Sequence, residues 1–214
     1  ISQALVDTSN VNFATAAIDE ALQSALDDYS QAAPFSNEYL LTLPGDGRTI
    51  ALAEITDLLA VTQIWWPYDS LEDDDVNEAA NLVRGFTLRF DDAQPIVHLK
   101  VKTGAGAPQL DDEMYVWYTK PHTIQNLASA STTTLPSPHE SGLVIGASAY
   151  AALARAINQA DEFNLDPKNP LNLQAWGAMQ MATFQRWLRL LSANTPAGST
   201  QTFSPRWKLD KWDV

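Results

Sequence analysis

The spacing of apolar residues changes from a helical period to a strand period and back again, and this order limits the possible folds. Apolar residues recur at helical spacing over 9–33, up to Pro34. From about 38 to 124, short runs of β-branched and aromatic residues alternate with turn-forming residues. Helical patterns return over 138–161 and 170–192. Because no helix-length pattern separates the strands, a parallel doubly wound sheet is disfavoured.

The middle segment has the pattern of an antiparallel sheet or small sandwich. Its first part predicts a hairpin, in which Tyr39–Leu43 and Thr49–Leu52 flank the turn Pro44-Gly45-Asp46-Gly47. The later strands are expected at Val61–Trp65, Phe86–Phe90, Ile96–Val101 and Met114–Tyr118.

The last two helical patterns have recognisable starts. Ser137-Pro138-His139-Glu140 predicts a capping box, and Asn169-Pro170 repeats the arrangement of a cap residue followed by proline. A short connector between the two patterns predicts an antiparallel helix pair. Small residues in the first of these helices allow another helix to approach closely, namely Gly142, Gly146, Ala147 and Ala151.

These patterns together predict an α+β fold. We expect a small helical bundle, made of a long N-terminal helix and a C-terminal antiparallel helix pair, that carries an antiparallel β insertion. Residues 1–194 are expected to form a single domain. Residues 195–214 follow as an extended arm, because 195–200 have linker composition.

Charge is distributed unevenly along the 214 residues. Residues 1–83 hold 15 acidic residues and one base, Arg48, whereas 84–214 are close to neutral and the whole chain carries a formal charge of -13. A protein that holds nucleic acid through its phosphates needs a basic face. We therefore expect no stable nucleic-acid binding, and the short apolar runs predict no membrane span.

No catalytic or cofactor motif is recognisable. The chain has no cysteine, and His98, His122 and His139 lack the spacing of a zinc site. Dinucleotide, phosphate-loop and nucleophile-elbow motifs are also absent. We expect no enzymatic activity, no cofactor and no metal.

Aromatic residues suggest surfaces for partners. Trp65-Trp66 stands before Pro67-Tyr68, and alternation along a strand sends one indole inward and the other outward. One interpretation is a core residue beside one packed under a loop. The other is an aromatic platform for a sugar, another subunit or a tail protein, formed by Trp65, Trp66 and Tyr68.

The C-terminal arm has the composition of a binding segment rather than of a polar tail. Aromatic, apolar and basic residues alternate in it, so we expect it to dock on a partner or on its own domain. The residues expected to make these contacts are Phe203, Pro205, Arg206, Trp207, Lys208, Leu209, Lys211 and Trp212.

Three segments of the chain combine a strand end, an exit from the sheet and a helix start. They are Trp65-Trp66-Pro67-Tyr68, Val116 to Ile124, and Leu135 to Glu140 followed by Val144 to Ala154. In these segments, and in the order of its elements, the chain resembles the head-to-tail adaptor (connector) proteins of tailed bacteriophages. The resemblance implies a helical bundle with a β insertion, assembled as a usually dodecameric ring beneath the portal protein, with C-terminal arms on the portal.

The resemblance implies a structural virion protein that joins portal to tail and encloses the DNA channel. Its partners would be the portal protein, a tail or stopper/tail-terminator protein, and further copies of the chain. It would act at the head-tail junction of the virion after assembly in the host cytoplasm, and DNA would pass it during ejection. An alternative from the residues alone is a carbohydrate-binding module or glycan hydrolase that uses the Trp65, Trp66 and Tyr68 platform.

Overall fold

The computed structural model describes residues 13–69, 81–92, 94–100, 106–160 and 168–194. They fall into two units. The helical unit takes its described residues from 1–37, 54–59 and 119–194, and the β unit from 38–53 and 60–118. The single domain expected over 1–194 stays a prediction.

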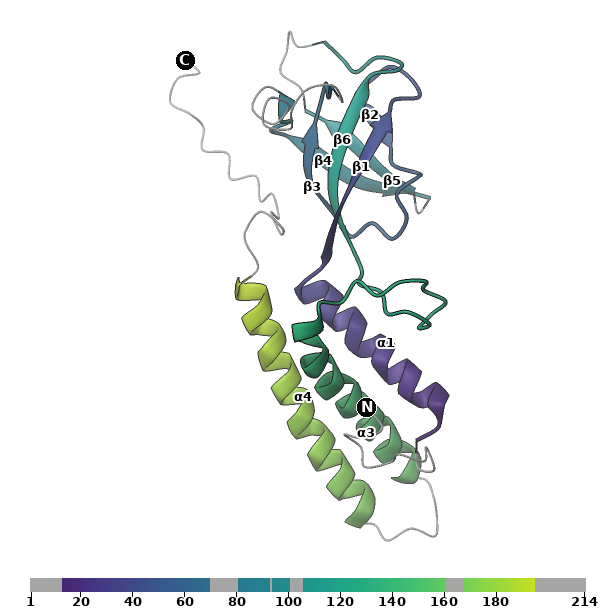
Figure 1. The fold of residues 1–214 in the computed structure, drawn as a ribbon, viewed down its shortest axis with the longest axis vertical. Helices are drawn as coiled ribbons and strands as arrows, with labels where there is room; N and C mark the ends of the chain where they lie inside the picture. Colours follow the sequence, from purple (N-terminus) through teal and green to yellow (C-terminus); the bar gives the residue numbers. More distant parts are fainter. Residues whose placement is uncertain (1–12, 70–80, 93, 101–105, 161–167, 195–214) are drawn as a thin grey trace. The chain divides into compact units, whose positions relative to one another are not determined.

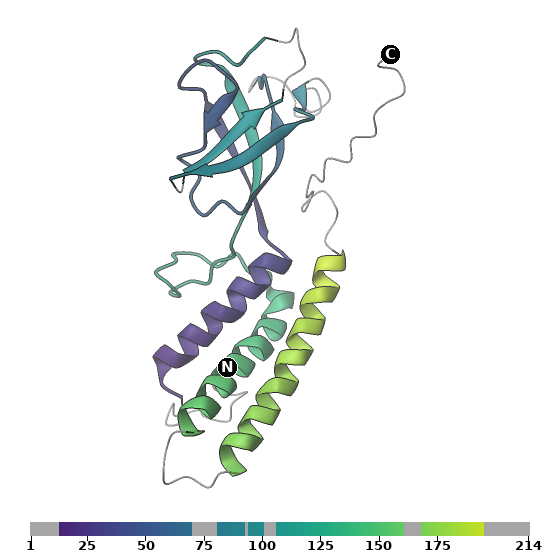
Figure 2. The same cartoon turned by 180° about the vertical axis from the view of Figure 1, so that it is seen from behind.

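The helical unit consists of α1 (Thr15–Ala32), the short 3-10 helix η1 (Ser137–His139), α3 (Glu140–Ala160) and α4 (Lys168–Asn194). Helix α3 lies between α1 and α4, as both views show (Figures 1 and 2). A helix between two others must be apolar on more than one side, and α3 meets this need with small residues. Its buried positions include Leu143, Ala147, Ala149, Ala151 and Ala152.

Close approach of α3 and α4 depends on two glycines, which confirms the role expected for them. A Cβ atom on Gly142 would lie 2.6 Å from the Trp187 ring, and one on Gly146 would lie 2.7 Å from the Phe184 ring. Real Cβ atoms do not approach other atoms so closely. The α4 rings therefore occupy the space where α3 has no side chain.

The helices start differently from their predicted positions. Helix α1 begins at Thr15, after Ala14 in extended conformation and with no side-chain cap. The expected start at residue 9 lies outside the described residues. The predicted capping box at Ser137 is wrong, because Pro136 takes the capping position, no side chain caps the turn, and Ser137 lies inside η1. Helix α4 begins at Lys168, so Pro170 lies in its first turn, where a missing N–H is tolerated.

The β unit contains two three-stranded sheets (Figure 1). One has the order β1-β6-β3 and the other β2-β5-β4. Buried residues are concentrated on the two central strands, where Val97, Leu99, Met114 and Val116 are fully buried. The strand bounds are β1 Phe35–Thr42, β2 Thr49–Ala51, β3 Ala60–Trp65, β4 Phe86–Asp91, β5 Gln94–Leu99 and β6 Glu113–Lys120.

The hairpin predicted over 39–52 is wrong. Strand β1 pairs with β6, and β2 pairs with β5 in the other sheet, with Ile50 opposite Val97. The turn between β1 and β2 is bonded to the loop before β6 instead. Gly47 donates its N–H to the Pro108 carbonyl at 2.8 Å, and the Asp46 carboxylate accepts the Leu110 N–H at 2.7 Å.

The expected fold, a small helical bundle with one antiparallel β insertion, is also wrong. The structure is a mixed α+β protein with three described helices and two antiparallel three-stranded sheets. The physical reason is that the strands have buried apolar residues of their own, among them Val97, Leu99, Met114 and Val116. A segment with its own core is a structural unit rather than an insertion in a helical one.

Candidate functional site

Four aromatic rings of the β unit pack together, and we call them the aromatic ladder. They are Trp65 on β3, Tyr68 after β3, and Tyr115 and Trp117 on β6. Tyr115 and Trp117 share one face of β6 because side chains two positions apart point the same way. Tyr68 and Tyr115 stack with ring centroids 4.8 Å apart, and Trp65 stacks on Tyr115 at 5.6 Å.

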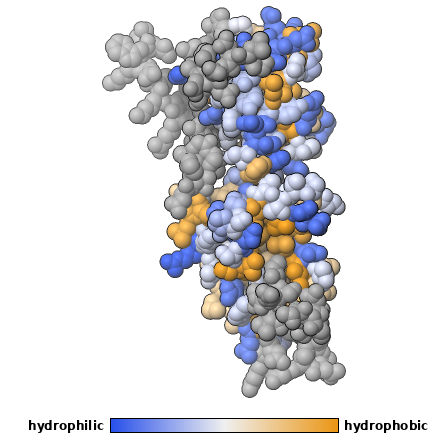
Figure 3. All heavy atoms as spheres, in the orientation of Figure 1, coloured by the Kyte–Doolittle hydropathy of each residue, from blue (hydrophilic) through white to orange (hydrophobic). Residues whose placement is uncertain are grey.

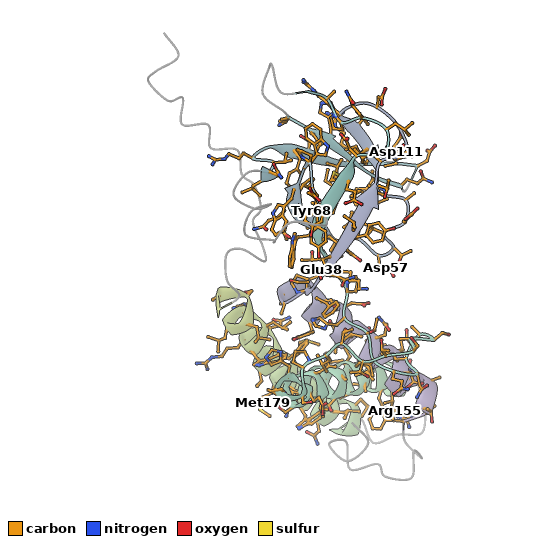
Figure 4. All side chains as sticks on the ribbon, turned by 45° about the horizontal axis from the view of Figure 1, so that its top comes forward. Glu38, Asp57, Tyr68, Asp111, Arg155 and Met179 are labelled. Atoms are coloured by element: carbon orange, nitrogen blue, oxygen red, sulfur yellow. The ribbon has the colours of Figure 1, made fainter. Side chains whose placement is uncertain are left out.

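The structure separates the two tryptophans that the sequence singled out. Trp65 is only 4% exposed and belongs to the core. Trp66 is half-buried, and its indole N–H donates to the Asp112 carboxylate at 3.2 Å. Tyr68, labelled in Figure 4, is also half-buried. A contact of these residues with another subunit or a tail protein stays a prediction, and only Trp66 and Tyr68 have exposed surface for it.

Two indole N–H groups of the ladder have no hydrogen-bond acceptor. They are Nε1 of Trp65 and Nε1 of Trp117, both buried. Leaving a buried donor unpaired costs about 1–3 kcal/mol. Packing of the rings against one another offsets this cost.

The ladder does not support the glycan alternative. A sugar platform needs ring faces that are open to solvent. In this structure Tyr68 and Tyr115 cover one another, and Trp65 is covered as well.

The helical unit contains a second aromatic cluster, around Tyr29 of α1. Trp187 stacks on this ring at 5.7 Å, and the His122 and His139 rings lie 5.0 and 5.6 Å from it. The Tyr29 hydroxyl and His139 Nδ1 are hydrogen-bonded at 2.6 Å. Burial raises the pKa of Tyr29, so its hydroxyl stays protonated at neutral pH.

His122 is buried in the same cluster and bonded on both ring nitrogens. Nε2 donates to the Ala33 carbonyl at 3.0 Å, and Nδ1 lies 3.1 Å from the Thr134 carbonyl. Burial lowers the pKa of His122, although both carbonyls act in the opposite direction. The ring therefore joins the end of α1 to the loop before η1 as a packing group. No three metal-ligating side chains gather anywhere in the described part of the chain.

Helices α1 and α4 border a shallow polar hollow of about 480 Å³ near their C-terminal ends. At its edge the Tyr150 hydroxyl donates to the Asp28 carboxylate at 2.6 Å. Burial, and then this carboxylate, raises the pKa of Tyr150 to about 12. The hollow is lined by Asp28, Gln31, Ala32, Gln185, Leu188, Arg189 and Ser192.

The long helix α4 turns an apolar and basic surface to solvent, which we call the α4 outer face. Leu171, Met179 and Leu190 are 63%, 59% and 58% exposed. Apolar surface at the C-terminal end of α4 is visible in Figure 3, and Met179 is labelled in Figure 4. The α4 sequence contains no acidic residue. The face consists of Leu171, Ala175, Met179, Ala182, Arg186, Arg189 and Leu190.

The sequence analysis missed two features of the structure, the Tyr115 and Trp117 part of the aromatic ladder and the α4 outer face. Tyr115 and Trp117 could have been found from their spacing of two on a predicted strand. The α4 outer face was hidden because the same helix also has a buried side, formed by Gly177 and Phe184. The arm residues expected to bind a partner, Phe203, Pro205, Arg206, Trp207, Lys208, Leu209, Lys211 and Trp212, lie outside the described residues.

Comparisons with known proteins give no family assignment. No family model matches the chain, and no curated protein matches it either. The resemblance to phage adaptors therefore rests on the sequence motifs alone. Among the described helices, none is both long and apolar enough to cross a membrane.

Proposed function

We propose that this chain is a structural virion protein, an adaptor of the head-tail connector that joins portal to tail and forms a ring around the DNA channel. The observation that carries the proposal is the α4 outer face. Three large apolar side chains and two arginines are exposed there, although the helix is packed on its other side. A row of exposed apolar side chains along one helix face suits a surface that binds another protein.

The packing of the aromatic and titratable side chains gives further support to the proposal. The two aromatic clusters are packed on themselves, and the titratable groups among them hold elements together. These features suit an assembly protein without enzymatic activity. The acidic first part of the chain and the charge of -13 suit a wall past which DNA slides without binding.

The proposed partners are the portal protein, a tail or stopper/tail-terminator protein, and further copies of the chain in a ring. Rings arise when one surface of a subunit binds a different surface of its neighbour. The location in this proposal is the head-tail junction of the virion.

The test is electron microscopy and mass photometry of the full chain, alone and with the portal protein of the same phage. We expect rings or ring fragments, either free or seated on the portal. A two-fold dimer that exposes no surface for further copies would contradict the proposal, as would a monomer that does not bind the portal. Glycan-array binding by that monomer would favour the glycan alternative.

A further inference from the structure

Helix α1 has an exposed surface whose charge is opposite to that of the α4 outer face. Glu20, Asp27 and Gln31 are exposed and share one side of α1, which we call the α1 outer face. The α1 sequence has four acidic residues and no base, whereas α4 has three bases and no acid. The Asp28 carboxylate accepts the Tyr150 hydroxyl and lines the hollow between α1 and α4, which Gln31 also borders.

The two outer faces belong to different helices of the unit, and Gln31 and Arg189 at their edges border the same hollow. Helix α1 buries Ile18, Ala21 and Ala25, and α4 buries Gly177 and Phe184, in both cases against α3 or its neighbours. Each outer face consists of exposed residues outside this packing. Two copies that pair these faces therefore use unlike surfaces, and the pairing can repeat from copy to copy.

The hollow between α1 and α4 shows how far along the helix axes the charged residues lie. Gln185, Arg189 and Ser192 line it together with Asp28 and Ala32, so these parts of α4 and α1 lie at the same height along the helices. Rotation about an axis parallel to the helices keeps every residue at its height. In such a ring, Arg186 and Arg189 of one copy stand opposite Asp27 of the next.

We propose that the α4 outer face of one copy packs on the α1 outer face of the next copy, with Arg186 and Arg189 paired to Asp27. This inference rests on the proposed ring, and it names the surfaces that build it. Apolar contact by Met179 and Leu190 supplies burial, and the charge pairs set the register and exclude pairing of two like faces.

Cysteine cross-linking tests the contact, since the chain has no cysteine of its own. Asp27→Cys and Arg186→Cys are made as separate variants and mixed under mild oxidation, alone and on the purified portal. We expect a covalent dimer from the mixture and none from either variant alone. The matched control replaces Arg186→Cys by Ala175→Cys, on the same face but about 16 Å along the helix, and should not cross-link.

Charge exchange provides an independent readout in the uncross-linked protein. Asp27→Lys and Arg186→Glu should each weaken self-association by about tenfold, because each places like charges opposite one another. The double variant should recover most of this loss. Sedimentation velocity measures the association, and circular dichroism checks that the helices remain.

The outcomes separate the contact from the function. Rings on the portal without the Asp27–Arg186 cross-link would overturn the contact and leave the proposed function standing. A cross-link of Arg186→Cys with itself would show a two-fold pairing and overturn the contact. Absence of any assembly, with and without portal, would overturn both.

Discussion

At the scale of single residues, His122 shows how one side chain can hold distant segments together. It has carbonyl contacts with Ala33 at the end of α1 and with Thr134 in the loop before η1, and it packs on Tyr29 and Phe35. Both carbonyls favour the charged ring, while burial and the nearby His139 oppose it, and burial is the largest effect. The folded protein therefore holds this histidine neutral more strongly than the unfolded chain does.

We predict that the folded protein loses stability on acidification partly through His122. The pKa of His122 in the folded protein is lowered from its ordinary value of 6.5. Just below pH 6.5 this histidine therefore binds a proton in the unfolded chain but not in the folded protein. This contribution is present above 6.5 and is lost as the pH falls toward the lowered pKa. Urea unfolding between about pH 7 and 5 measures it. His122→Gln should flatten the profile, and a variant whose stability falls as steeply as that of the wild type would refute the assignment.

At the scale of elements, we predict that the close contact of α3 with α4 makes the protein sensitive to substitution at Gly146. Gly146→Ala places a methyl group 2.7 Å from the Phe184 ring, which is only 1% exposed. Alanine favours a helix by about 1 kcal/mol over glycine, and overpacking costs about 1–3 kcal/mol, so we expect a net loss of about 1 kcal/mol. Denaturant unfolding followed by circular dichroism measures it.

The control for this substitution is Gly45→Ala, because a Cβ atom there meets nothing within 4 Å. Its free energy of unfolding should change by less than about 0.5 kcal/mol. A Gly146→Ala variant as stable as the wild type would mean that α4 can move away from α3 at little cost.

Elements were easier to predict than their pairings. Strands such as β3 and β6 follow from alternation and residue type, and α3 and α4 from their proline-marked starts. The Asp46-Gly47 turn is a strong local signal, yet its N–H and carboxylate bond to Pro108 and Leu110, about sixty residues away. The local sequence predicts the turn but not which strands pair, because packing between distant parts of the chain determines the pairing.

At the scale of the whole molecule, the sequence indicated binding surfaces without locating the described ones. It marked Trp65, which is in the core, and missed the α4 outer face, which is exposed. Burial depends on what covers a residue, and a partner strand or helix far along the chain provides that cover. Exposed apolar side chains on a helix therefore become visible only when the neighbouring elements are in place.

We predict that the C-terminal arm anchors the chain to a partner, because its composition is that of a binding segment. Each buried Trp or Phe contributes on the order of 2 kcal/mol from area alone, and in the proposed ring the arms of many copies would bind together. Deleting 203–214, or changing Trp207 and Trp212 to Ala, should keep the helical signal in circular dichroism but abolish incorporation into portal-bearing heads. Changing Arg206, Lys208 and Lys211 to Gln should weaken incorporation less, because exposed ion pairs are worth little. If particles incorporate the truncated chain at full occupancy, the arm is not the anchor to the portal.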